Sequence, residues 1–291
     1  MRYRGIDRCY TCPFRTEMEK DNKPAVWEKD VPVSAGRKRG KNWMSSLSRR
    51  YLCITFAIML ICWGICFLCG RSNLLLNENY WLYLPYLLGG LSPTIASFIV
   101  LKRSGRVKTL KEWIRNIFDF RHSLWSYAIV LLMAVLYMLP QCLISGYEKG
   151  APLPAILFII PMMVIGGGLE EAGWRYLLQP ELEEKYSFTI ATVIIGLIWW
   201  LWHMPLFYIP GVAQYGMDYL AFGISVMGMS FALACIRKST GSVWLCVLFH
   251  AIVNSLSGVY LIHENIMGNT ISSVILIAAV YLLLFMKKRI K

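Results

Sequence analysis

Several features of soluble enzymes and secreted proteins are missing from this sequence. It has no internal repeat, no low-complexity tract and no Gly-rich loop of the kind that binds nucleotide phosphates. The first fifty residues hold 13 Lys or Arg and six acids but no apolar core, which is unlike a cleavable signal peptide. We therefore interpret residues 1–50 as a basic, polar cytosolic extension and residues 51–291 as a separate domain.

Cysteine is present, but not in a disulfide or metal pattern. Seven of the nine cysteines lie within or beside apolar segments, where a small polarizable side chain packs well, so no disulfide framework is indicated. Cys9 and Cys12 form a single Cys-x-x-Cys pair. A closed zinc site needs two more ligands, and residues 1–50 contain no His and no further Cys. We assign the cysteines no role.

Apolar residues dominate what is there, at 57% of the chain with a mean hydropathy of +0.50. After about residue 50, apolar runs of roughly 18 to 25 residues recur, and a helix of that length crosses ~30 Å of hydrocarbon. The sequence therefore predicts an all-α, polytopic integral membrane protein with about eight transmembrane helices. The expected spans are near residues 51–69, 82–101, 123–144, 154–179, 188–208, 219–236, 242–261 and 271–286.

The charges support this layout. If the N-terminus is inside, 27 of the 30 Lys and Arg fall on cytoplasmic segments, which predicts that both termini are cytoplasmic. Residues 106–120 place apolar side chains at helical spacing among basic ones, which indicates an amphipathic helix on the cytoplasmic surface. The net charge of +13 then reflects topology and contact with anionic lipid. We expect membrane lipid, and no nucleic acid, as a partner in a multi-pass protein of the cell membrane.

Few ionisable groups lie well inside the expected spans. A charge at bilayer depth costs several kcal/mol, so such residues are functional candidates by default. They are Glu170, Glu171 and Arg175 on the fourth span, His203 on the fifth and His250 on the seventh, with Asn254 one turn beyond.

Helix geometry divides the cluster on the fourth span. Glu171 and Arg175 are four residues apart, so they share a face and can neutralise each other. Glu170 is rotated by about 100° from its neighbour and is free to address another partner, which suits a general base. The glycines at 166–168 would permit close helix approach or local unwinding.

A carboxylate, two imidazoles and an amide inside a membrane match the needs of peptide hydrolysis, and two versions are open. In one, Glu170 and His203 activate water while His250 and Asn254 donate to the oxyanion. In the other, Glu170, His203 and His250 hold Zn²⁺ with an open position for water. Zinc is therefore a cofactor in one version, whereas the other needs no metal.

At these residues the chain resembles the family of intramembrane proteases that includes CAAX prenyl endopeptidases and bacterial bacteriocin-processing or abortive-infection proteins. The resemblance rests on Glu-Glu-x-x-x-Arg at 170–175, aromatic-x-x-x-His at 199–203 and His-x-x-x-Asn at 250–254. Trp199 stands where the family usually has Phe. Order and spacing agree across a core at about residues 150–260, and the eight-span layout is also similar.

The resemblance implies a role for each matching residue. Glu170 would be the catalytic base, His203 would assist water activation, and His250 with Asn254 would stabilise the oxyanion. The neighbouring Glu-Arg pair would mainly hold the site together. Relatives are described both as metalloproteases and as metal-free glutamate enzymes.

We therefore expect an intramembrane endopeptidase that cleaves a membrane-associated peptide or protein near the cytoplasmic leaflet. CAAX-type processing, bacteriocin maturation and self-immunity are all compatible with the sequence. One alternative is a catalytically silent immunity or scaffold protein on the same fold. A less favoured one is a small proton-coupled transporter, because no inverted repeat is detectable.

Overall fold

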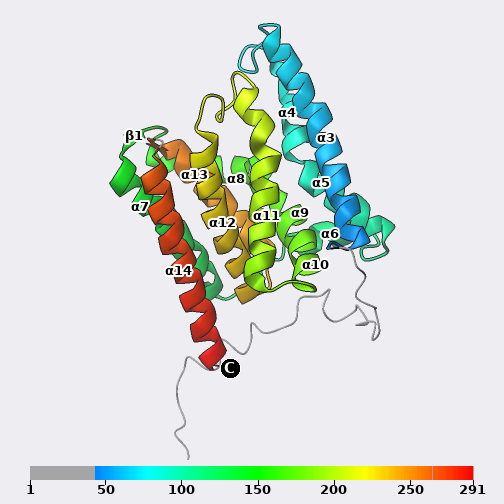
Figure 1. Ribbon diagram of the computed structural model, residues 1–291, viewed down its shortest axis with the longest axis vertical. Coiled ribbons are helices and arrows are strands. Elements are labelled where there is room, and N and C mark those ends of the chain that lie inside the picture. Colours follow the sequence, from blue (N-terminus) through cyan, green and yellow to red (C-terminus); the bar gives the residue numbers. More distant parts are fainter. Residues whose placement is uncertain (1–42, 264, 291) are drawn as a thin grey trace, which may run out of the picture.

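The computed structural model describes residues 43–263 and 265–290, which form a bundle of apolar helices (Figure 1). Most of the expected extension at residues 1–50, including Cys9 and Cys12, lies outside the described residues. The expected all-α membrane fold is confirmed, and the protein is a multi-pass integral membrane protein. The long helices are α3 (Ser46–Arg71), α7 (Leu124–Ser145), α11 (Phe188–His203), α12 (Tyr219–Thr240), α13 (Trp244–Val259) and α14 (Ile266–Ile290).

Shorter elements connect them or interrupt the expected spans. They are η1 (Tyr80–Leu82), α4 (Tyr83–Gly90), α5 (Ser92–Arg103), α6 (Leu110–Ile117), η2 (Leu153–Ala155), α8 (Ile156–Gly166), η3 (Gly168–Glu170), α9 (Glu171–Gly173), η4 (Trp174–Leu178), α10 (Gln179–Glu183) and η5 (Met204–Tyr208). The two short strands β1 (Tyr147–Lys149) and β2 (Tyr260–Ile262) pair antiparallel.

A helix occupies each of the eight expected positions, but not every helix qualifies as a span. Within the described residues, six segments are long and apolar enough to cross a membrane, or seven if the pair Tyr80–Gly90 and Ser92–Arg103, bent by 49°, is one span. Pro93 at the start of α5 accounts for the bend, because proline cannot continue the preceding helix. The remaining helix, α13, has 16 residues and is about 24 Å long. The count of eight and the location of the termini therefore stay predictions.

The fourth expected span is not a continuous helix. The regular helix α8 ends at Gly166. The short helical turns η3 and α9 follow it, and they lead into the wider π-helical turn η4. A Cβ atom at Gly167 would overlap the side chain of Asn254, and one at Gly168 would lie 2.7 Å from the carbonyl oxygen of Val247. The glycines thus permit both of the features expected of them, unwinding and close approach to α13.

The two ends of the bundle, the basic end and the strand end, differ in the elements that they hold. The basic end holds the start of α3, helix α6 and the C-terminal end of α14, whereas the strand end holds β1, β2 and the loop 209–218 between η5 and α12 (Figure 1). Helix α6 is amphipathic as expected, since it buries Trp113 and Ile117 and exposes Lys111 and Arg115.

Candidate active site

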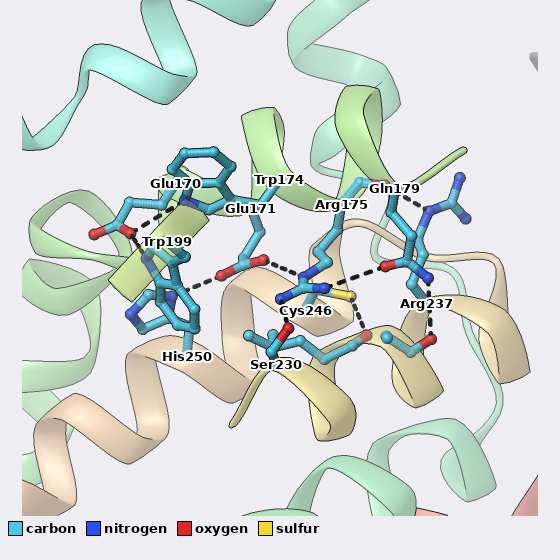
Figure 2. Close-up of polar contacts among 12 residues, drawn as sticks. Glu170, Glu171, Trp174, Arg175, Gln179, Trp199, Ser230, Arg237, Cys246 and His250 are labelled. Atoms are coloured by element: carbon cyan, nitrogen blue, oxygen red, sulfur yellow. Dashed lines mark hydrogen bonds and ion pairs between the residues drawn. The ribbon is translucent and has the colours of Figure 1, made fainter. Parts of the chain in front are cut away.

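Glu170 is held by two indoles at the break in the fourth span. Its Oε2 accepts hydrogen bonds from Nε1 of Trp199 at 2.8 Å and from Nε1 of Trp174 at 3.4 Å (Figure 2). Both donors bind the same oxygen, so Oε1 has no hydrogen-bond donor among the described residues. The side chain is buried from the exterior but forms part of a cavity wall. One carboxylate oxygen is therefore fixed while the other remains available.

The carboxylate of Glu171 binds two basic side chains, one through each of its oxygens. Its Oε2 lies 3.1 Å from Nε of Arg175, the pairing expected from their spacing, and its Oε1 lies 2.9 Å from Nδ1 of His250 (Figure 2). Glu171 and Arg175 are both fully buried. The second bond joins α9 to α13 and was not predicted, because the two residues are 79 apart in the sequence.

Arg175 extends this network of buried hydrogen bonds away from Glu170. Its Nη1 donates to Oε1 of Gln179 at 3.4 Å, its Nη2 donates to Oγ of Ser230 at 3.2 Å, and its carbonyl oxygen accepts from Nε of Arg237 at 3.3 Å (Figure 2). Sequence reasoning missed these partners. Gln179 could have been found, because it lies four residues beyond Arg175. Ser230 and Arg237 are on α12, and no spacing rule relates them to the fourth span.

His203 is oriented by the backbone of its own helix. Its Nδ1 lies 2.8 Å from the carbonyl oxygen of Trp199, and its ring packs between Trp202 and Phe222. A carbonyl oxygen can only accept, so Nδ1 carries the hydrogen and the Nε2 atom of a neutral ring presents a lone pair. His203 can therefore act as a hydrogen-bond acceptor or base through Nε2.

His250 and Asn254 lie one turn apart on α13. Nε2 of His250 lies 3.1 Å from the position that a Cβ atom at Gly167 would take, and the Asn254 amide approaches the same point. Asn254 makes no hydrogen bond to any described residue. The absence of a side chain at Gly167 thus leaves space beside two groups that can donate hydrogen bonds.

A cavity of about 460 Å³ brings these groups together. Four of the six predicted site residues line it: Glu170, His203, His250 and Asn254. The other two, Glu171 and Arg175, lie behind the wall and do not line it. Much of the remaining wall is aromatic, with contributions from Trp63, Tyr86, Trp202 and Phe222. Four of the predicted site residues therefore face the cavity, whereas Glu171 and Arg175 support them from the buried interior.

The donor atoms of the site decide whether a metal ion would fit. Each histidine directs Nδ1 to an oxygen acceptor, an orientation that metal-binding histidines share. Nevertheless, no three His, Cys, Asp or Glu side chains in the described part of the chain lie close enough together to hold a metal. Among the described residues, Glu170, His203 and His250 therefore do not form the ligand set that the zinc version requires.

Comparison with known proteins agrees with the three motifs. Residues 152–256 match the family model described as type II CAAX prenyl endopeptidase Rce1-like. CAAX prenyl protease 2 of Methanococcus maripaludis is 25% identical over 230 residues, which cover 70% of this chain and 81% of that protein. The matched segment contains every predicted site residue. Over residues 152–256, the chain is therefore similar to the type II CAAX prenyl endopeptidases of the Rce1-like family, a family of membrane-embedded peptidases.

Proposed function

We propose that this protein is an intramembrane endopeptidase that cleaves a membrane-associated peptide or protein, with Glu170 as the base that activates water. The observation that carries the proposal is the cavity in which the free Oε1 of Glu170 is gathered with His203, His250 and Asn254. The similarity to CAAX prenyl endopeptidases supports the reaction class. Substrates related to those of a CAAX prenyl protease are the first to test.

Water activation requires a proton acceptor and a second group that orients the water. Oε1 of Glu170 takes the proton while Oε2 stays bonded to the two indoles. The other hydrogen stays on the water oxygen and donates a hydrogen bond to Nε2 of His203, which is free to accept because the hydrogen on Nδ1 is engaged by Trp199. The water oxygen then forms a bond to the carbonyl carbon, and the π electrons of the carbonyl move to its oxygen.

The oxyanion formed in this step needs donors. His250 donates from Nε2 when its ring is doubly protonated, a form that the carboxylate of Glu171 stabilises through Nδ1. Asn254 donates from Nδ2 at the same side of the cavity. Collapse of the tetrahedral intermediate breaks the carbon–nitrogen bond, and the proton taken up by Glu170 passes to the leaving amine.

Glu171 and Arg175 act as positioning residues in this mechanism. They do not line the cavity, yet Glu171 fixes the ring of His250 and Arg175 fixes Glu171. Their bond is fully buried, so removal of either partner would leave an uncompensated charge in the interior.

The test is cleavage by purified protein in lipid nanodiscs, measured with a library of lipid-anchored and unmodified peptides. Glu170→Gln should lower kcat at least a thousandfold while the thermal unfolding temperature changes little. Glu184→Gln is the matched control, since Glu184 is exposed on the same segment and lies outside the cavity. Cleavage by Glu170→Gln at the wild-type rate would refute the role of Glu170 as the base. No cleavage of any peptide by the wild type would refute the endopeptidase proposal and favour a catalytically silent protein.

A further inference from the structure

A cavity separate from the active site lies at the basic end. The start of α3 and the end of α5 form its wall, and these two helices pack against each other (Figure 1). Its volume is about 340 Å³, which is within the range of small-ligand sites, and it shares no lining residue with the active-site cavity. Arg50, Cys53 and Arg103 on its wall are exposed, so the cavity opens on the molecular surface.

Arg50 and Arg103 bring two positive charges to this cavity from different helices. Neither guanidinium makes a hydrogen bond or an ion pair with another described residue, and no described Asp or Glu lines the cavity. Glu181, an acid at the same end, is already bound by Arg106 at 2.5 Å and by the hydroxyl of Ser45 at 2.5 Å. Two like charges that share a cavity repel each other, so an anion is the favoured occupant.

The end of α5 does not need the side chain of Arg103. A basic residue at a helix end often binds the last carbonyl oxygens, but here backbone groups already do so. The carbonyl oxygen of Val100 accepts from the N–H of Ser104 at 3.0 Å. The carbonyl oxygen of Leu101 accepts from the N–H of Arg106 at 3.1 Å and from the hydroxyl of Ser104 at 3.0 Å. The guanidinium of Arg103 is therefore available to an external anion.

The apolar part of the wall indicates that this anion carries hydrocarbon. Ile54 and Val100 line the same cavity as the two guanidinium groups. Ala57 and Ile61 lie three and seven residues beyond Ile54, so they continue its face of α3 past the cavity, and both are exposed. In a membrane-spanning helix such a face contacts acyl chains. A phospholipid can therefore place its phosphate beside the arginines and a chain along α3, whereas a soluble phosphate gains nothing from the apolar surface.

The charge of the cavity discriminates between phospholipid headgroups. Arginine binds a phosphate through two parallel N–H donors, and two guanidinium groups carry more charge than one phosphodiester neutralises. A zwitterionic headgroup adds an ammonium group, which both arginines repel. An anionic headgroup adds no cation and is preferred for that reason.

We propose that the cavity between α3 and α5 binds one anionic phospholipid, with its phosphate between Arg50 and Arg103 and an acyl chain along Ile54 and Ala57. The sequence predicted contact with anionic lipid for the basic segments as a whole. The proposal assigns that contact to one site with a preferred headgroup charge. Such binding does not depend on peptide cleavage, so its test needs no assay of activity.

The test is native mass spectrometry of the intact protein in detergent, titrated with phosphatidylglycerol or with phosphatidylcholine of the same acyl chains. The cavity variant combines Arg50→Gln with Arg103→Gln. The matched control combines Arg49→Gln with Lys102→Gln, which removes the same charge from adjacent residues that do not line the cavity. All four side chains are exposed, so both variants should unfold at the wild-type temperature in phosphatidylcholine.

We expect the wild type to bind one phosphatidylglycerol at least tenfold more tightly than phosphatidylcholine. The cavity variant should reduce this preference to less than about threefold, and the control variant should keep it. Equal affinity of the wild type for the two lipids would overturn the proposal. An equal loss of affinity in both variants would also overturn it, because general attraction of anionic lipid to the basic end would then explain the binding.

A competition experiment distinguishes a lipid from a soluble phosphate. Inorganic phosphate and glycerol 3-phosphate carry the anionic group without acyl chains, so about a hundredfold excess of either should leave phosphatidylglycerol bound. Displacement of the lipid by either compound from the wild type would overturn the proposal and assign the two arginines to a soluble phosphate compound.

Discussion

Trp199 binds Glu170 through its side chain while it orients a histidine through its backbone. Its indole Nε1 lies 2.8 Å from Glu170 Oε2, and its carbonyl oxygen lies 2.8 Å from Nδ1 of His203. Family resemblance places Phe at this position, and Phe has no N–H to donate. The side chain of Trp199 therefore makes a hydrogen bond to Glu170 that a phenylalanine could not make.

Trp199→Phe should lower kcat about 10–100-fold, the usual cost of losing a group that orients a reactive one. The backbone bond to His203 remains, so KM and the unfolding temperature should change little. Trp200→Phe is the control, since the Trp200 indole donates to the carbonyl oxygen of Tyr219. Equal effects of the two variants on kcat would show that the bond to Glu170 has no role in the reaction.

Arg175→Lys should destabilise the protein by about 1.5–3 kcal/mol, because lysine keeps the charge but cannot reproduce the buried guanidinium bonds to Glu171 and Ser230. The measurement is thermal or denaturant unfolding in detergent. Lys238→Ala breaks an ion pair with Glu183 whose lysine is 45% exposed, and it should cost less than about 1 kcal/mol. A wild-type unfolding curve for Arg175→Lys would mean that the buried network does not stabilise the fold.

Asn254→Leu keeps the size of the side chain but removes its N–H donor. If Asn254 stabilises the oxyanion, kcat should fall by about 10²–10³ with KM nearly unchanged. Ser257→Ala changes another residue of the cavity wall on α13 and should leave kcat within a fewfold of wild type. A rise in KM alone for Asn254→Leu would reassign the amide to substrate binding.

Gly167→Ala places a methyl group against the amide of Asn254 and 3.1 Å from Nε2 of His250. We expect at least a tenfold loss of kcat, since the methyl group fills the space that the oxyanion donors share. Gly64→Ala provides the comparison, because nothing lies within 4 Å of its Cβ position and the helix should gain up to about 1 kcal/mol. Full activity of Gly167→Ala would place the reacting carbonyl elsewhere.

Removal of metal should leave cleavage unchanged, because the described residues contain no set of three ligands. The check is the rate after dialysis against a chelator, together with metal content by mass spectrometry. Loss of activity that added zinc restores would instead require Glu170, His203 and His250 to move together around the ion.

Contacts between side chains of one helix could be predicted from the sequence, whereas contacts between side chains of different helices could not. Spacing rules found the Glu171–Arg175 pair because backbone geometry places residues four apart on one face. The bond from Glu171 to His250 depends on how α9 packs against α13, which no periodicity encodes. Similarly, hydropathy placed a helix at each expected span but treated residues 154–179 as continuous, since a break at Gly167 scarcely changes the average apolarity of the segment.

The β1–β2 pair has a mechanical consequence for the site. Helix α13 has 16 residues, so its length alone does not fix its position along the membrane normal. The pairing of Tyr147 with Ile262 ties the end of α13 to the end of α7, a longer helix of 22 residues. These three residue pairs therefore add to the packing of α13 against its neighbours in resisting movement of His250 and Asn254 along the membrane normal.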